Sequence, residues 1–270
     1  MLLKVKYFIK SLLPPILFNV LQKYRTQKYG WKGDYLTWQQ AKNASTGYDT
    51  DKIIDAVKNA LLKVKKGEAV YERDSVIFDE IQYSWPLLAG LMFVAVKLGE
   101  VKVLDFGGSL GSTYYQNKKF LDRIESVSWS IVEQERFVEA GKTEFEDNRL
   151  NFFHTVDECV IKNRPNVLLL SSVLQYIEKP YELLDDILKH DFEYILIDRN
   201  PFVNLREKIT LQVVSPAIYE ASYPCHFFNE ERFIEYFAKK QYLIVETFIS
   251  NDGKNNDCIF KGMILEKNHA

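Results

Sequence analysis

The chain has 270 residues, 47% of them hydrophobic, and a formal net charge of -2. This length allows a full core, as one α/β domain or as a domain with an appendage, and the charge predicts no nucleic-acid partner. Three scattered cysteines exclude a disulfide framework and indicate a reducing, cytoplasmic location, and the isolated histidines predict no metal site.

Residues 1–30 form a basic amphipathic segment. Lysines alternate with apolar residues up to Pro14-Pro15, and no acidic residue occurs before Asp34. The apolar run is much shorter than the ~20 residues that a membrane span needs. Two interpretations stay open: the segment lies on an anionic membrane surface, which makes the protein peripheral at the inner face of the membrane, or it packs on the domain.

Residues 31–98 predict a helical extension or lid. Apolar residues recur at helical spacing over 53–64, and Gly67 ends that helix. A second helical region covers 75–98, in which Pro86 predicts a kink or a helix start.

Residues 99–270 alternate between strands and helices. Asn251-Asp252-Gly253 predicts a hairpin turn between the last two strands. The fold class is therefore α/β, a Rossmann-like seven-stranded sheet with helices on both faces, preceded by the N-terminal helical region. We expect strands at 101–106, 127–132, 150–153, 167–170, 194–197, 242–248 and 258–265, and helices at 112–124, 135–145, 156–162, 181–188 and 230–239.

The most informative motif is a glycine-rich turn directly after the strand at 101–106. Such a strand–turn–helix unit holds a nucleoside cofactor at the carboxyl end of a parallel sheet. The glycine spacing fails the dinucleotide pattern G-x-G-x-x-G and reads D-x-G-x-x-x-G, with Ser109 where a middle glycine is usual. It resembles the S-adenosylmethionine loop of class I methyltransferases, which implies cofactor contacts from Asp105, Gly107, Gly108, Ser109 and Gly111.

From about Gly30 onward, nearly the whole chain resembles class I S-adenosylmethionine-dependent methyltransferases. More narrowly, it resembles a family of methyltransferases encoded among bacterial surface-polysaccharide genes. The resemblance implies S-adenosylmethionine as cofactor and a small-molecule or saccharide acceptor in surface-polysaccharide biosynthesis. The matching stretches are 30–35, 67–75, 83–86, 105–112, 132–134, 171–176, 198–199 and 223–225.

Further cofactor contacts are expected at two strand ends. Glu133 ends the second predicted strand of the sheet, where a carboxylate accepts hydrogen bonds from ribose hydroxyls, and Gln134 beside it covers the adenine. Ser171 and Ser172 follow the fourth strand at the expected ligand crevice. The structural alternatives are a solvated acid at Glu133 and serines that cap the next helix.

The acceptor side is expected to form from residues after the fourth and fifth strands. His226 lies in the aromatic segment 219–228 and is a candidate general base, with Asp198 as the rival base. Arg199 would pair with an anionic acceptor group, and Tyr176 and Tyr223 would supply pocket walls. A histidine packed among aromatic rings is the structural alternative.

Tyr71 and Arg73 complete the expected acceptor site. They belong to the mixed-charge run 71–74, which we interpret either as an ion-paired lid over the cofactor or as an exposed helix-cap cluster. No residue is expected to ligate a metal.

The motif and the resemblance together predict methyl transfer from S-adenosylmethionine to a small hydroxyl, amine or carboxylate acceptor. Two alternatives stay open. The first is a methyltransferase-like protein that binds without catalysis as a partner of a glycan-assembly complex, an option kept by Ser109 in place of glycine. The second is an NAD-dependent sugar oxidoreductase, which the failed glycine spacing disfavours.

Overall fold

The computed structural model of the protein describes residues 29–47, 50–216, 218–254 and 258–269. The basic segment, with its membrane and packing interpretations, thus lies almost wholly outside the described residues. Within them, no helix is both long and apolar enough to cross a bilayer. The described chain forms two units, the first from within 1–48 and 209–224, the second from within 49–208 and 225–270.

The first unit is built on an antiparallel strand pair. Strand β1 (Gly30–Tyr35) pairs with β9 (Lys208–Val213), and helix α3 (Trp38–Ala44) follows β1. The α3 helix begins because the Thr37 hydroxyl accepts from the backbone N of Gln40 at 3.2 Å. Neither strand was predicted. Strand β1 shows no alternation of polar and apolar residues, whereas β9 (Lys-Ile-Thr-Leu-Gln-Val) alternates at every position and was overlooked.

The second unit contains a sheet in the strand order β6-β5-β4-β7-β8-β12-β11. The strands from β6 to β8 are parallel, and β12 is antiparallel to β8 and to β11. This confirms the predicted Rossmann-like α/β sheet with its closing antiparallel hairpin. The bounds are β4 (Glu100–Phe106), β5 (Ser126–Val132), β6 (Leu150–Phe153), β7 (Val167–Ser171), β8 (Tyr194–Val203), β11 (Tyr242–Lys254) and β12 (Ile259–Lys267).

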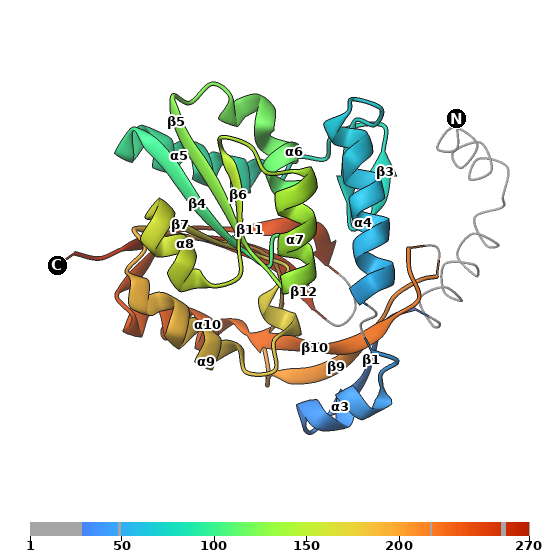
Figure 1. Ribbon diagram of the computed structural model, residues 1–270. Coiled ribbons are helices and arrows are strands. Elements are labelled where there is room, and N and C mark those ends of the chain that lie inside the picture. The colour runs from blue at the N-terminus through green and yellow to red at the C-terminus, as the bar shows by residue number, and fades with distance from the viewer. Residues whose placement is uncertain (1–28, 48–49, 217, 255–257, 270) are drawn as a thin grey trace, which may run out of the picture. The chain divides into compact units, whose positions relative to one another are not determined.

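Helices cover both faces of this sheet (Figure 1). On one face Gly90 of α5 lies against Leu196 of β8 and Ile264 of β12. On the other face, the neighbouring Ile195 and Ile197 belong to a core that includes α9 and α10 side chains, as the period-2 alternation of a strand requires. The helices are α4 (Thr50–Lys65), α5 (Trp85–Leu98), α6 (Ser112–Leu121), α7 (Glu135–Glu144), α8 (Val156–Asn163), α9 (Pro180–Ile187) and α10 (Glu230–Lys239).

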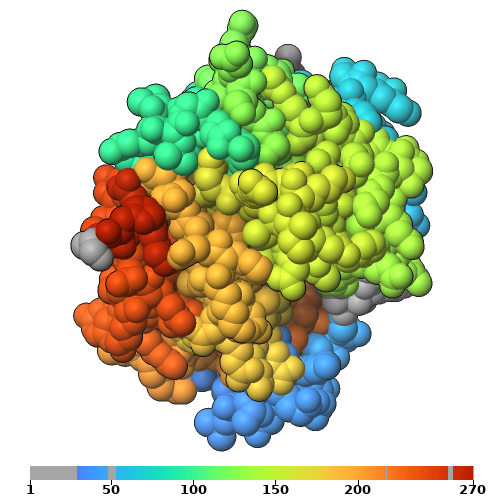
Figure 2. Space-filling view, turned by 60° about the vertical axis from the view of Figure 1, so that its left-hand side comes forward, coloured from blue at the N-terminus to red at the C-terminus, as the bar shows by residue number. Residues whose placement is uncertain are grey.

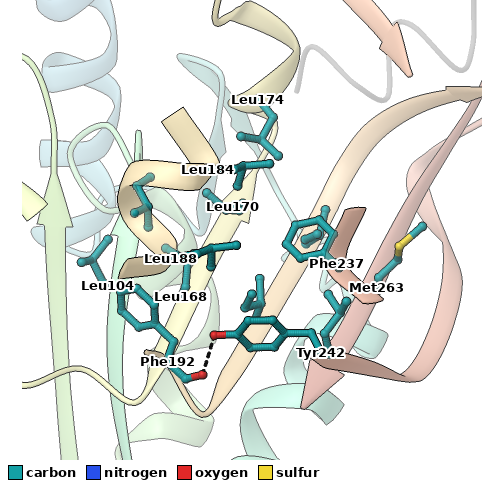
Figure 3. Close-up of a cluster of buried hydrophobic side chains, with 14 of the residues drawn as sticks. Leu104, Leu168, Leu170, Leu174, Leu184, Leu188, Phe192, Phe237, Tyr242 and Met263 are labelled. Atoms are coloured by element: carbon teal, nitrogen blue, oxygen red, sulfur yellow. Dashed lines mark hydrogen bonds between the residues drawn. The ribbon is translucent and has the colours of Figure 1, made fainter. Parts of the chain in front are cut away.

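The core beneath α9 and α10 is closely packed and apolar (Figure 3). Leu168 and Leu170 of β7 are fully buried there, which explains why β7 reads as an unbroken apolar run. The hydroxyl of Tyr242 donates to the backbone O of Phe192 at 2.8 Å, so the one polar atom of that ring is satisfied. In the space-filling view, the yellow and light-orange chain that carries α8 and α9 closes over this face (Figure 2).

Two predicted elements are wrong. The region 75–84 is not helical: β2 (Tyr71–Arg73) and β3 (Val76–Phe78) form a hairpin, and α5 starts with Pro86 in its first turn. Asp74 and Ser75 have positive φ, as a tight two-residue hairpin turn requires. The expected turn at 251–253 instead lies inside β11, within an irregularity between Ile249 and Lys254.

Candidate functional site

The glycine-rich turn lies at the carboxyl end of β4 and leads into α6. Gly107 has φ +70°, and a Cβ built on it would lie 2.5 Å from Cγ2 of Val173. A Cβ on Gly108 would lie 2.5 Å from Oδ2 of Asp105. Both positions therefore exclude a side chain, because a Cβ atom would overlap neighbouring side chains of the protein itself.

Asp105 is the acidic residue before the turn, and it is 1% exposed. Its Oδ2 accepts from Nε1 of Trp129 on β5 at 3.0 Å. Burial raises the pKa of Asp105 to about 7, with a further increase from Glu133 and an opposing effect of the Trp129 hydrogen bond. The carboxyl group therefore organises the turn from inside the protein.

We expect Asp105→Asn to change how stability depends on pH. A carboxyl whose pKa rises from 3.8 to about 7 on folding binds more protons in the folded state, so its contribution to stability is lost as pH rises from about 4 to about 7. At about 1.4 kcal/mol per pKa unit, that loss approaches ~4 kcal/mol. Asparagine does not ionise and still offers Trp129 an acceptor.

The measurement is urea denaturation of both proteins at about pH 4, 6 and 8. Only the difference between wild type and variant isolates Asp105, because other carboxyls also titrate. The free energy of unfolding of Asp105→Asn, relative to that of the wild type, should increase as pH rises. A difference that stays constant over this range would contradict the buried, proton-binding role of Asp105.

Glu133 ends β5 beside the glycine-rich turn. Its carboxylate accepts from the backbone N of Gln134 at 2.7 Å and from the backbone N of Ser109 in the turn. Burial raises the pKa of Glu133, and these two hydrogen bonds oppose the increase. A carboxylate offers about four lone-pair sites, so two remain for hydroxyl groups of a ligand. Gln134 itself is exposed.

Ser171 and Ser172 lie at the carboxyl end of β7, next along the sheet from β4. The backbone N of Ser172 donates to the backbone O of Asp198 at 3.0 Å, so this turn is fixed to β8. Val173 follows and contacts the position of Gly107. The predicted cofactor residues of β4, β5 and β7 therefore meet at one edge of the sheet.

The β2–β3 hairpin is attached to the start of α6. Glu72, which is 1% exposed, accepts from Oγ of Ser112 at 2.5 Å and from the backbone N of Ser75 at 2.6 Å. Burial raises the pKa of Glu72 to about 6. Tyr71 is also buried, and its hydroxyl accepts from Nε2 of Gln116 on α6 at 3.0 Å. The hairpin thus lies beside the glycine-rich turn.

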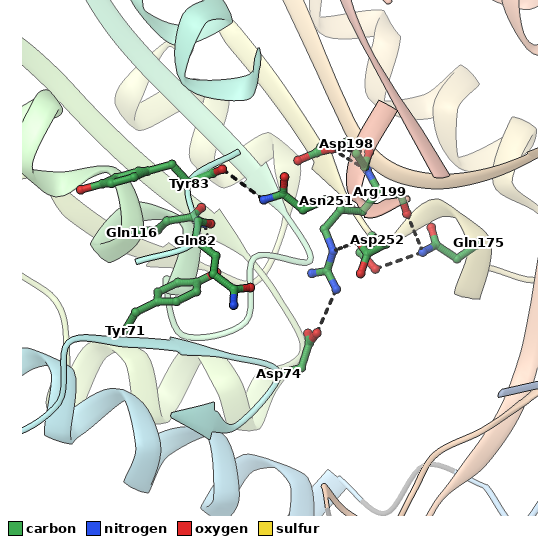
Figure 4. Close-up of polar contacts among 12 residues, drawn as sticks. Tyr71, Asp74, Gln82, Tyr83, Gln116, Gln175, Asp198, Arg199, Asn251 and Asp252 are labelled. Atoms are coloured by element: carbon green, nitrogen blue, oxygen red, sulfur yellow. Dashed lines mark hydrogen bonds and ion pairs between the residues drawn. The ribbon is translucent and has the colours of Figure 1, made fainter. Parts of the chain in front are cut away.

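Strand β8 is irregular where it reaches this edge. Asn200 pairs with Lys261 and Ile197 with Met263, so three steps on β8 oppose two on β12. Arg199, inside this bulge, has φ +59°. Bulges of this kind re-aim side chains at the rims of sheets, and here the bulge directs Arg199 toward the hairpin (Figure 4).

Arg199 joins three segments by ion pairs. Its Nη2 lies 2.9 Å from Oδ2 of Asp74 in the hairpin turn, and its Nε lies 2.7 Å from Oδ2 of Asp252 in β11 (Figure 4). Arg199 holds the pKa of Asp74 below its usual range. Asp74 of the mixed-charge run 71–74 is therefore ion-paired with Arg199, whose guanidinium faces two carboxylates.

Asp198 is 2% exposed. Its Oδ1 accepts from Oγ of Ser250 at 2.6 Å and from the backbone N of Arg199 at 2.8 Å. Burial raises the pKa of Asp198. This carboxyl fixes the β8 bulge to β11. Sequence reasoning missed Ser250, and it read Asp252 only as part of a turn, because no local pattern reports a contact some 50 residues away.

Tyr176 and Gln175 lie in the short helix η1 (Leu174–Tyr176) after β7. Burial raises the pKa of Tyr176, and the charges of Arg199 and Asp74 act on it in opposite directions. Nε2 of Gln175 donates to the backbone O of Arg199 at 3.2 Å. Gln175, which the sequence did not single out as a site residue, thus contacts the backbone of Arg199, and the charge of Arg199 acts on both Tyr71 and Tyr176.

His226 lies on β10 (Ser222–Asn229), a strand that the sequence did not predict. Its Nε2 is 3.2 Å from the backbone O of Glu178, and its ring stacks on Phe228. A carbonyl only accepts, so Nε2 carries the proton of the neutral ring. Burial lowers the pKa of His226, which favours that neutral form.

The remaining predicted residues are placed as follows. Arg73 lies with its guanidinium 5.8 Å from the centroid of the Phe78 ring. Tyr223 belongs to the first unit, and its hydroxyl is 3.4 Å from that of Tyr219. Among the residues that the structure describes, no group of three or more histidine, cysteine, aspartate or glutamate side chains could hold a metal ion.

Comparison with known proteins yields structural similarities at low sequence identity. No family model and no curated protein matches the chain. The N-terminal domain of EvdMO1, solved in the presence of SAH and D-fucose, has 11% identity and a TM-score of 0.49, covering 82% of this chain and 98% of that one.

Two further structures are similar. The Burkholderia thailandensis 1,6-didemethyltoxoflavin-N1-methyltransferase, with bound 1,6-didemethyltoxoflavin and S-adenosylhomocysteine, has 14% identity, a TM-score of 0.46 and coverage of 82% and 92%. An S-adenosylmethionine-dependent methyltransferase from Clostridium acetobutylicum has 11% identity, a TM-score of 0.46 and coverage of 69% and 93%. The ligands named here were observed in those structures.

Proposed function

We propose that the protein is an S-adenosylmethionine-dependent methyltransferase that acts on a small-molecule acceptor. The observation that carries the proposal is the junction of the glycine-rich turn with Glu133. The turn after β4 and the carboxylate at the end of the adjacent β5 are hydrogen-bonded to each other through Ser109. That is where a parallel sheet of this order binds a nucleoside.

The residues present fit this cofactor. Gly107 and Gly108 let the turn pack directly against the Val173 and Asp105 side chains, so the backbone follows one tight path at the end of β4. Glu133 retains lone pairs for the two ribose hydroxyls, and Gln134 is exposed beside it. The cofactor supplies a methyl group on a sulfonium. The chain itself supplies orientation and a site that restricts water, which suffices for an in-line displacement.

The first test is ligand binding by calorimetry and thermal shift. S-adenosylhomocysteine should bind and raise the melting temperature, because a ligand that binds only the folded state stabilises it. NAD should do neither, which separates this function from the oxidoreductase alternative. Stabilisation by NAD together with no effect of S-adenosylhomocysteine would reverse the proposal.

We further propose His226, whose Nε2 lies 3.2 Å from the backbone O of Glu178, as the general base. His226→Ala should leave cofactor affinity unchanged and lower turnover on the acceptor about 10²-fold, the low end for a lost base. Asp198 is the rival, although its hydrogen bonds favour a positioning role. Loss of turnover on Asp198→Asn alone, with a stable fold, would assign the base to β8.

The acceptor is proposed to be a saccharide or its precursor, on the resemblance to surface-polysaccharide methyltransferases. Tyr176 is half-buried after β7 and offers an aromatic ring, a surface that suits a sugar ring. A labelled-methyl transfer assay with free sugars and sugar nucleotides tests this. Cofactor binding without transfer to any acceptor would favour the non-catalytic alternative.

A further inference from the structure

We propose that Gln175 selects the acceptor, and that it selects a compound that can donate a hydrogen bond, an alcohol or an amine, over a carboxylate or phosphate. This rests on the methyltransferase function proposed above and narrows its acceptor class. Gln175 is fully buried. Its carboxamide points toward Arg199, in the cluster that holds Asp198 and Asp252 (Figure 4).

The two ends of the Gln175 carboxamide can be told apart. One end lies 3.2 Å from the backbone O of Arg199 and 3.0 Å from Oγ of Ser172. Because a carbonyl oxygen only accepts, that end is the Nε2 donor. Oε1 is therefore the other end, and it accepts from no described residue.

An unpaired buried acceptor is unfavourable, so Oε1 is matched to a ligand that brings an O–H or N–H. Asn200, the residue after Arg199, also has unpaired buried polar atoms. Asn200 is fully buried, and neither its Oδ1 nor its Nδ2 has a partner among the described residues. A carboxylate or phosphate dianion offers Gln175 no proton and leaves Oε1 facing negative charge.

The charges around Gln175 point the same way. Arg199 is already paired with Asp74 at 2.9 Å and Asp252 at 2.7 Å, so an anionic acceptor would have to displace a carboxylate. Arg73, the other cation of the hairpin, interacts with Asp74. Arg199 therefore serves as a structural crosslink and does not bind an anionic group of the acceptor.

Entry of a ligand requires a movement, because Gln175 is covered in the structure. The ion pairs of Arg199 are the contacts beside it that can open without disturbing the apolar core. Asp74 has a 54% exposed side chain and lies at the tip of the two-stranded hairpin. Such a hairpin has little stability of its own, so its ion pair with Arg199 is the natural point of opening.

The experiment measures probe binding by saturation-transfer NMR with S-adenosylhomocysteine at saturation. The probes are matched sets: benzyl alcohol, benzylamine and benzoate, and methyl glucoside with glucuronate. The wild type should bind the alcohol and amine members at least about tenfold more tightly than the acids. Gln175→Leu should lose that preference and keep its affinity for S-adenosylhomocysteine.

Asn117→Leu is the matched control. Asn117 is also fully buried, its Nδ2 donates to the backbone O of Thr113 at 2.9 Å, and its Oδ1 is unpaired, but it lies on α6. This variant should keep the wild-type preference. A double variant, Asp74→Asn with Asp252→Asn, frees Arg199 and should bind the acids at least about tenfold better than the wild type. It keeps the proposal testable if Gln175→Leu does not fold.

Three results would overturn the proposal: acids bound as tightly as alcohols by the wild type, an unchanged preference in Gln175→Leu, or no probe binding while S-adenosylhomocysteine binds. If the wild type does not bind S-adenosylhomocysteine at all, the methyltransferase proposal fails first, and the two failures are thereby distinguished.

Discussion

Gly107→Ala is expected to destabilise the protein by about 2–5 kcal/mol and to abolish detectable cofactor binding. Alanine at φ +70° meets the left-handed conformation, which costs about 1–2 kcal/mol. Its Cβ would also lie 2.5 Å from Cγ2 of Val173. Valine is stiff at χ1, so the turn or η1 must shift, and overpacking adds about 1–3 kcal/mol.

The matched control is Gly67→Ala. Gly67 has φ +74°, nearly the same backbone conformation, but no atom lies within 4 Å of the Cβ position. This variant should lose only the conformational part, about 1–2 kcal/mol. Urea denaturation of both variants separates the two contributions. Equal losses would mean that Val173 yields freely and that the turn is less constrained than its contacts indicate.

Glu133→Ala is expected to weaken S-adenosylhomocysteine binding by about 1.5–3 kcal/mol, the range for hydrogen bonds to a charged group. This corresponds to a dissociation constant raised about 10- to 150-fold. The loss includes the ribose contacts and the support that the carboxylate gives to Ser109. Titration calorimetry at one ionic strength is the measurement.

Glu139→Ala controls for the loss of a negative charge, because Glu139 is an exposed glutamate on the following α7. It should bind S-adenosylhomocysteine as the wild type does. If Glu133→Ala also binds normally, Glu133 is a solvated strand-end acid after all, and the nucleoside site must be sought elsewhere on the sheet edge.

The fold of the second unit could be predicted because its signals are local. The apolar run at 167–170 and the acid and glycines at the end of the strand at 101–106 each indicate a strand or its end within a few residues. The hairpin at 71–78 could not be predicted in this way. Its strands have three residues each, too few to show a period, and its turn uses Asp74-Ser75 instead of a glycine pair.

In the candidate site, too, the residues with local sequence signals could be predicted, and those that depend on distant contacts could not. Asp105, Gly107 and Glu133 could be predicted as one site because each lies at or next to the end of a predicted parallel strand, and such strand ends meet at one edge of the sheet. The cluster around Arg199 depends on bulges in β8 and β11, and a bulge leaves little trace in sequence because it needs only one tolerant residue. Gln175 could not be predicted as a site residue, because its interest depends on which end of its carboxamide is hydrogen-bonded, and the sequence does not show its partners.

Ser109 has φ +53°, so a serine occupies a backbone shape that glycine takes without strain. That shape is not intrinsic to the residue, and the Glu133 carboxylate, which accepts from the Ser109 N–H, helps to impose it. The end of β5 and the glycine-rich turn therefore stabilise each other's conformation. We therefore expect that a nucleoside bound to Glu133, as proposed above, would also stabilise the turn.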